Sequence, residues 1–133
     1  MENETPFQCI LLVDDDANTN YIHQSYLKRI GLAEEVITVT NGQLALDYLQ
    51  NGGELPDLIL LDLNMPVMDG FEFLEHFEKL NLSSHAGPVV IISSSDNENH
   101  IHKAERYGAV RDYLVKPIYK QQWLRIAEKF GRG

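Results

Sequence analysis

Three short runs of the sequence are hydrophobic at every position, and they constrain the fold more than any other feature. They are Ile10-Leu11-Leu12-Val13, Leu58-Ile59-Leu60-Leu61 and Val89-Val90-Ile91-Ile92. Successive residues of a strand point to opposite faces, so a continuous hydrophobic run suits a strand that is covered on both faces. Coverage on both faces is typical of a parallel sheet with helices on each side. We predict strands over residues 7–13, 35–39, 57–61, 89–92 and 111–115.

The segments between these strands have helical spacing. In the last segment, hydrophobic residues recur at positions i, i+3, i+4 and i+7, namely Trp123, Ile126, Ala127 and Phe130. Five strands and five helices in strict alternation predict an α/β fold. Right-handed crossovers then favour a doubly wound five-stranded parallel sheet in the flavodoxin-like order 2-1-3-4-5.

Length and charge limit the functional classes. A chain of 133 residues suits one domain, which we predict over residues 1–133 with a core over about 7–130. The formal net charge of −9 disfavours direct binding of nucleic acids or anionic membranes, because such binding requires a positive field. Cys9 is the single cysteine and lies among hydrophobic residues, so we expect a buried thiol.

No hydrophobic run approaches the ~20 residues that a membrane-spanning helix needs. The N-terminal residues 1–7 also lack the basic and then hydrophobic pattern of a signal peptide. We therefore expect a soluble, cytoplasmic protein.

Polar residues directly follow four of the predicted strands. In open parallel sheets, ligands bind beyond the carboxyl ends of the strands, so these residues are the candidate site. They are Asp14, Asp15 and Asp16 after the first strand, Asp62 after the third, Ser93 after the fourth and Lys116 after the fifth. Crowded carboxylates repel one another, and Mg²⁺ with oxygen ligands relieves that repulsion. Carboxylates, Mg²⁺, a hydroxyl and an ammonium together indicate phosphoryl transfer.

Four segments resemble the receiver domains of bacterial two-component response regulators, and the resemblance extends over residues 7–130. The segments are Val13-Asp14-Asp15-Asp16, Thr40-Asn41-Gly42-Gln43-Leu44-Ala45-Leu46, Leu61-Asp62-Leu63-Asn64-Met65-Pro66-Val67-Met68-Asp69-Gly70 and Tyr113-Leu114-Val115-Lys116-Pro117. Their order and spacing make the resemblance specific.

The resemblance implies a role for each acidic residue of the site. Asp62 is the implied phosphoacceptor. Asp14 and Asp15 would hold Mg²⁺ together with Asp62 and the backbone carbonyl of Asn64. Lys116 would pair with Asp62 and then with its phosphoryl group, and its bond to Pro117 is often cis in this family.

Two further positions match the switch residues of the family. Ser93 occupies the position of the switch hydroxyl, where threonine is commoner, and Ser94 is the alternative if the strand is displaced by one residue. Tyr113 occupies the position of the switch aromatic ring. Residues 80–88, between the third helix and the fourth strand, form a longer segment than in the smallest family members.

The implied function is a stand-alone signalling switch with no effector domain. A histidine kinase or a phosphotransfer protein would phosphorylate Asp62. The phosphoryl group would then change affinity for a protein partner through the surface of the fourth helix, fifth strand and fifth helix. Such a protein is not a dedicated enzyme, because it catalyses only its own phosphorylation and dephosphorylation.

Three alternatives fit the residues less well. A phosphatase of the haloacid dehalogenase type needs a second acid two residues after the nucleophile, where this chain has Asn64. A flavodoxin-like FMN carrier needs a hydroxyl- and glycine-rich phosphate loop after the first strand, where this chain has three aspartates. A receiver domain that works without phosphorylation would have no need of the complete set of site residues.

Overall fold

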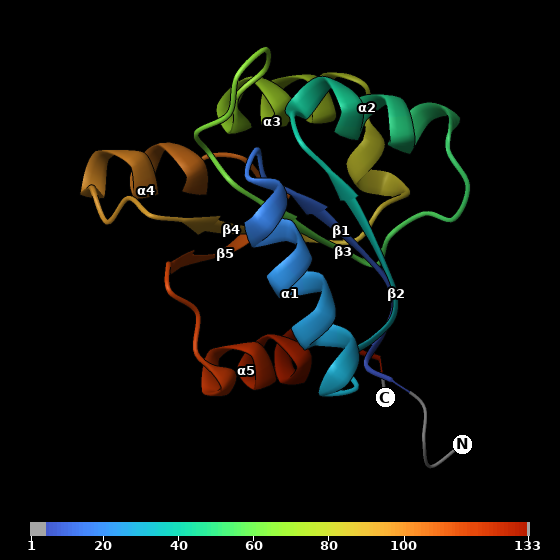
Figure 1. Cartoon of the computed structure of the whole chain (residues 1–133). Coiled ribbons are helices and arrows are strands. Elements are labelled where there is room, and N and C mark those ends of the chain that lie inside the picture. The colour runs from blue at the N-terminus through green and yellow to red at the C-terminus, as the bar shows by residue number, and fades with distance from the viewer. Residues whose placement is uncertain (1–4, 133) are drawn as a thin grey trace.

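A five-stranded parallel sheet in the order β2-β1-β3-β4-β5 organises the structure, a computed structural model that describes residues 5–132 (Figure 1). The strands are β1 (Phe7–Val13), β2 (Ala33–Val39), β3 (Leu58–Leu61), β4 (Val89–Ser93) and β5 (Val110–Val115). The helices are α1 (Ala17–Arg29), α2 (Gly42–Asn51), α3 (Gly70–Lys79), α4 (Glu98–Glu105) and α5 (Lys120–Phe130), with a short 3₁₀ helix η1 (Leu82–Ser84). The predicted fold class and strand order are confirmed.

Helices cover both faces of the sheet. Leu11 and Val13 of β1 pack in one hydrophobic cluster with residues of α2, α3 and α4. Ile10 and Leu12, which point to the other face, pack in a second cluster with residues of α1 and α5. All four side chains are at most 2% exposed, which explains why this strand is hydrophobic at successive positions.

The strand ends differ from the predicted ones by one or two residues, except in β1. β2 begins two residues earlier than predicted, because Ala33 pairs with Phe7 of β1. β3 begins one residue later, at Leu58. Asp57 instead uses its carboxylate to accept the backbone N–H groups of Gln8 and Cys9, at 3.0 and 3.1 Å.

Residues 80–88 contain the 3₁₀ helix and return the chain to the sheet. Asn81, at φ 58°, begins the turn after α3, and Ala86 packs against the cluster beneath α2 and α3. The N–H of Gly87 then donates to the carbonyl of Pro56 at 3.0 Å. This segment therefore leads into β4 at the edge of the sheet opposite the candidate site.

Two expectations about burial and membranes can be compared with the structure. Cys9 is buried as predicted, and burial raises the pKa of its thiol to about 11. Within the described residues, every helix is too short or too polar to cross a bilayer.

The loop between β3 and α3 is tightly folded against the sheet. Met68 donates its N–H to the carbonyl of Pro66 at 2.7 Å across Val67, which lies at φ 67°. Gly70 then begins α3 against the chain that carries Asp62, and its N–H donates to the carbonyl of Leu63 at 2.9 Å. This contact fixes where the loop leaves the candidate site.

Gly70→Ala should destabilise the protein by about 1–3 kcal/mol, because an added methyl group forces packed backbone to move. A Cβ at this position would lie 2.7 Å from Cα of Leu63 and 2.8 Å from the carbonyl oxygen of Asp62. Urea denaturation measures the change. Gly53→Ala is the control, because an added Cβ there has no neighbour within 4 Å. Equal stabilities of the two variants would show that the contact at Gly70 is not tight.

Candidate functional site

Three carboxylates gather at the carboxyl edge of the sheet. Asp14 and Asp15 follow β1, and Asp62 follows β3; Val13 and Leu61, the last residues of these strands, are register partners. One oxygen of each carboxylate lies within 4.8 Å of the others. Asp14 and Asp62 are only 6% and 7% exposed, whereas Asp15 is exposed. Oxygen donors in this arrangement fit a hard divalent cation such as Mg²⁺ or Mn²⁺.

The third acid of the first loop has a structural role. Asp16 is the N-cap of α1, and its carboxylate accepts the N–H of Asn18 at 2.9 Å and the hydroxyl of Thr19 at 3.0 Å. These hydrogen bonds lower the pKa of Asp16. The cap starts α1 directly after the two acids that face Asp62.

Lys116 supplies the positive charge of the site. Its backbone N–H donates to the carbonyl of Ser93 at 2.8 Å, and its bond to Pro117 is cis. The ammonium donates to Oδ2 of Asp14 at 2.7 Å. The structure thus pairs Lys116 with Asp14, and the pairing with Asp62 that the resemblance implies stays a prediction. The ammonium of Lys116 donates a hydrogen bond to Asp14, and its positive charge also lowers the pKa of Asp62.

The carboxyl of Asp62 is held in an unfavourable environment for its charge. Burial raises its pKa to about 6; the charge of Lys116 and the backbone N–H of Asn64 lower it, and the charges of Asp14 and Asp15 raise it. Asn64 is exposed, and its backbone N–H is the group that acts on Asp62 here. Burial and the neighbouring carboxylates thus disfavour the ionised form of Asp62, and Lys116 and Asn64 favour it.

Ser93 and Tyr113 meet through one residue that the sequence interpretation did not identify. Ser93 is fully buried at the end of β4, whereas Ser94 is exposed. Oγ of Ser93 accepts the N–H of Ser95 at 3.1 Å, and the hydroxyl of Tyr113 donates to the carbonyl of Ser95 at 2.8 Å. Oγ of Ser95 also lies 2.9 Å from Nδ1 of His100 on α4. Ser95 thus links Ser93 to the half-buried Tyr113 and to α4.

Asn20 and His23 of α1 were also missed, although the sequence contains a signal for Asn20. It precedes the buried Leu27 by seven residues, so both lie on the inner face of the helix. Asparagine is a poor helix former, and a buried one indicates a specific polar contact. The amide of Asn20 donates to the carbonyl of Asp14 at 2.9 Å.

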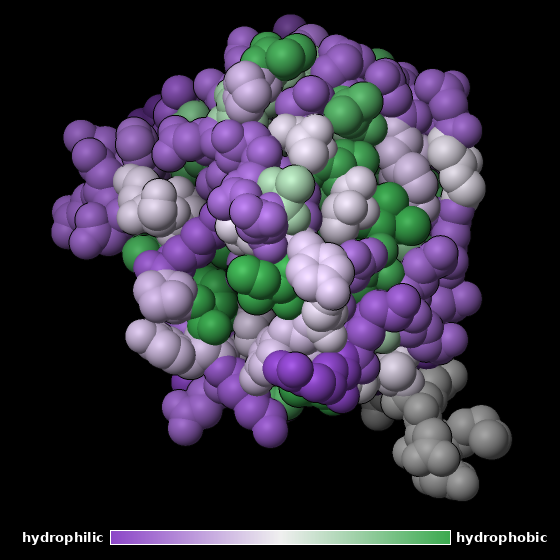
Figure 2. Space-filling view, in the orientation of Figure 1, coloured by the Kyte–Doolittle hydropathy of each residue, from purple (hydrophilic) through white to green (hydrophobic). Residues whose placement is uncertain are grey.

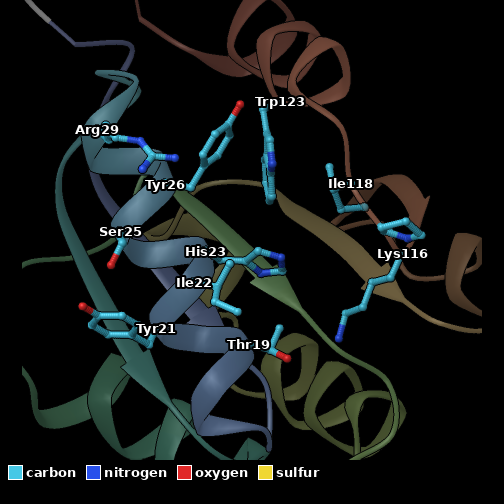
Figure 3. A pocket seen from close by; sticks show the side chains of 11 residues that line it. Thr19, Tyr21, Ile22, His23, Ser25, Tyr26, Arg29, Lys116, Ile118 and Trp123 are labelled. Atoms are coloured by element: carbon cyan, nitrogen blue, oxygen red, sulfur yellow. The ribbon is translucent and has the colours of Figure 1, made fainter.

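A hollow of about 750 Å³ opens beside Lys116, between α1 and the start of α5 (Figure 3). Its lining includes Ile22, Tyr26, His23 and Trp123. The rings of His23 and Trp123 meet edge to face, with centroids 5.4 Å apart. Hydrophobic side chains reach the surface in this region, between more hydrophilic ones (Figure 2). His23 thus lines the hollow and also lies near Asp14, whose charge acts on its ring.

Comparison with known proteins identifies similar chains. The sequence model of the response regulator receiver domain matches residues 10–128. The probable methanogenesis regulatory protein FilR2 of Methanothrix harundinacea is 31% identical, over 97% of this chain and 84% of its own length. The chain spans only 14–17% of three other curated relatives.

Two solved structures show the same architecture. The phosphorylated cyanobacterial phytochrome response regulator RcpA is 34% identical, with a TM-score of 0.74 over 92% of this chain and 89% of that chain. The Mn²⁺-bound form of response regulator Rcp1 is 30% identical, with a TM-score of 0.73 over 92% and 90% of the two chains.

The raised pKa of Asp62 predicts a pH-dependent loss of stability in metal-free protein. Its ordinary value is 3.8 and its folded value about 6, so between these values the folded state binds more protons than the unfolded state. Stability therefore falls as the pH rises through this interval. Asp62→Asn cannot ionise, so its stability should not fall in this way between about pH 4 and pH 6.

Urea denaturation in EDTA, from about pH 4.5 to 7.5, compares the wild type with Asp62→Asn. Asp47→Asn is the control, because Asp47 is exposed on α2 and away from the cluster. Parallel stability curves for the wild type and Asp62→Asn would contradict the prediction.

Proposed function

The chain belongs to the response regulator receiver domain family, and on that premise we propose that it is a phosphorylation-controlled switch whose phosphoacceptor is Asp62. The observation that carries the proposal is the cluster of Asp14, Asp15 and Asp62 beside the ammonium of Lys116. Phosphoryl transfer needs little more than positioning and charge neutralisation, and this cluster supplies both.

The oxygen donors of the cluster support Mg²⁺ as the metal. Asp14, Asp15 and Asp62, with the backbone carbonyl of Asn64, would hold it. When bound, Mg²⁺ neutralises negative charge on the carboxylates and on the phosphoryl oxygens. The Mn²⁺-bound structure of Rcp1 supports a divalent cation in a related chain.

Asp62 would act as the nucleophile toward a phosphohistidine of a histidine kinase or phosphotransfer protein. Its carboxylate oxygen forms the new bond to phosphorus as the phosphorus–nitrogen bond of the donor breaks, and the departing nitrogen keeps the electron pair. The ammonium of Lys116 would then pair with the phosphoryl group. The phosphorylated state of RcpA supports this chemistry in a related chain.

Ser93 would report the phosphoryl group to the surface through Ser95. Its hydroxyl would turn toward a phosphoryl oxygen. The hydrogen bond that it accepts from the N–H of Ser95 in the unphosphorylated structure would then break. Movement of Ser95 changes the partners of Tyr113 and His100, and so displaces α4 relative to β5. To move the ratio of active to inactive conformation from 1:99 to 99:1, phosphorylation must stabilise the active conformation by about 5.5 kcal/mol relative to the inactive one. We therefore place the downstream protein partner on the α4–β5–α5 surface.

A haloacid dehalogenase-type phosphatase is the less favoured alternative. It requires a carboxylic acid two residues after the nucleophile, and Asn64 cannot donate or accept that proton.

Acetyl phosphate and Mg²⁺ should add one phosphoryl group to the wild type, because the site itself supplies the catalytic groups. Asp62→Asn should remain unmodified, as measured by intact mass. Asp96→Asn, which changes an exposed acid in the loop after β4, is the control and should be modified like the wild type. Full labelling of Asp62→Asn would overturn the assignment.

Ser93→Ala should separate the chemistry from the switch. Asp62 should still be phosphorylated, because the nucleophile, the acids and Lys116 are unchanged. A hydrogen bond to a charged group contributes ~1.5–3 kcal/mol, so its loss should weaken the bias toward the active state roughly ten- to a hundredfold. Amide shifts of α4 and β5 after addition of beryllofluoride measure that bias. Ser94→Ala is the control, and full wild-type shifts in Ser93→Ala would exclude Ser93 as the switch hydroxyl.

A further inference from the structure

The side chain of Asn20 is held firmly on one side and has an unused acceptor on the other. It is 4% exposed, and Nδ2 donates to the carbonyls of Asp14 and Val39, at 2.9 and 3.3 Å. The carbonyl of Val39 also accepts the N–H of Asp14 at 3.2 Å. These bonds fix the orientation of the amide. Its Oδ1 is buried and is the one such side-chain atom of the described residues without a hydrogen-bond partner.

Asn20 lines a small cavity directly beneath the carboxylates. The cavity has a volume of about 10 Å³ and lies between α1 and the carboxyl ends of β1, β3 and β4. Its polar lining is Asp14, Asn20, His23 and Asp62, and its remaining lining is hydrophobic. A volume near 10–15 Å³ with two to four polar partners is what one buried water requires.

His23 has the chemistry to complete such a site. Burial and the charge of Lys116 lower the pKa of His23, against an opposite effect of Asp14, and so favour the neutral ring. A neutral imidazole offers one donor and one acceptor. Figure 3 shows His23 pointing from α1 into the region between Trp123 and Lys116. His23 lines both the large hollow and the small cavity, and so lies between them.

We propose that this cavity binds one water molecule that donates to Oδ1 of Asn20 and to the carboxylate of Asp62. Asn20 is thereby a positioning residue for the nucleophile, and this second part depends on the proposed function of Asp62. The two donations use both hydrogens of the water, and its oxygen can accept from His23. The water would thus stabilise the ionised carboxylate of Asp62 from within the cavity.

A high-resolution crystal structure of the unphosphorylated protein tests the water directly. We expect one density peak within about 3.2 Å of both Oδ1 of Asn20 and a carboxylate oxygen of Asp62. A cavity without density, or a ring nitrogen of His23 bonded directly to Oδ1, would overturn the proposal. This result does not depend on whether Asp62 is phosphorylated.

Two variants that differ by one oxygen test the positioning role. Asn20→Ala and Asn20→Ser both lose the amide donor, but only the serine retains a hydroxyl that can accept from the water. At saturating Mg²⁺, the maximal rate of labelling by acetyl phosphate should be roughly fivefold higher in Asn20→Ser than in Asn20→Ala, with similar KM. Asn18→Ala, an exposed position on the same helix, should match the wild type.

Equal maximal rates in the alanine and serine variants would refute the positioning role. Labelling of the wild type at a residue other than Asp62 would refute the proposed function and leave the water site standing. Circular dichroism establishes whether both variants fold; if either does not, the crystallographic density decides the proposal.

Discussion

Repulsion among Asp14, Asp15 and Asp62, offset by one ammonium, is the interaction on which the rest of this structure depends. The three carboxylates approach within 4.8 Å because β1 and β3 are neighbours in the sheet and end side by side. Burial of Asp14 and Asp62 makes their charges more costly than on an open surface. The hydrophobic clusters on both faces of the sheet hold these strand ends in place against that repulsion. The fold therefore holds an unfavourable arrangement of charges that a bound cation can relieve.

The carboxyl edge of the sheet also connects the candidate site to α4 on the protein surface. Ser93 ends β4 beside β3, and its hydroxyl holds the N–H of Ser95. Ser95 in turn contacts Tyr113 of β5 and His100 of α4, so a single residue joins three elements. On α4, the ring of His100 also packs against Phe71 of α3, at a centroid distance of 6.1 Å. A change at Ser93 thus has a short, contiguous route to α4.

The sequence predicts this fold and site well where both depend on strand ends. Hydrophobic runs locate β1, β3 and β4, and the residues after them must meet at one edge, so the proximity of Asp14 and Asp62 follows from topology. The partner of Lys116 does not follow, because several carboxylates lie within reach of a long, flexible side chain. Helical spacing can place Asn20 on the inner face of α1, but the hydrogen-bond partners of Asn20 and of Ser95 escape prediction for a related reason. The amide of Asn20 donates to the carbonyl of Val39, and the carbonyl of Ser95 accepts the hydroxyl of Tyr113; no local pattern specifies these distant partners.

The effect of Mg²⁺ on thermal stability tests most directly whether repulsion among the three carboxylates destabilises the metal-free protein. Wild-type protein should melt at a higher temperature with Mg²⁺, by a free energy of RT ln(1 + [L]/Kd), because the ion binds the folded cluster. Asp15→Asn removes one exposed carboxylate; it should melt above the wild type in EDTA and respond much less to Mg²⁺. A variant no more stable than the wild type in EDTA, with an equal response to Mg²⁺, would contradict the account.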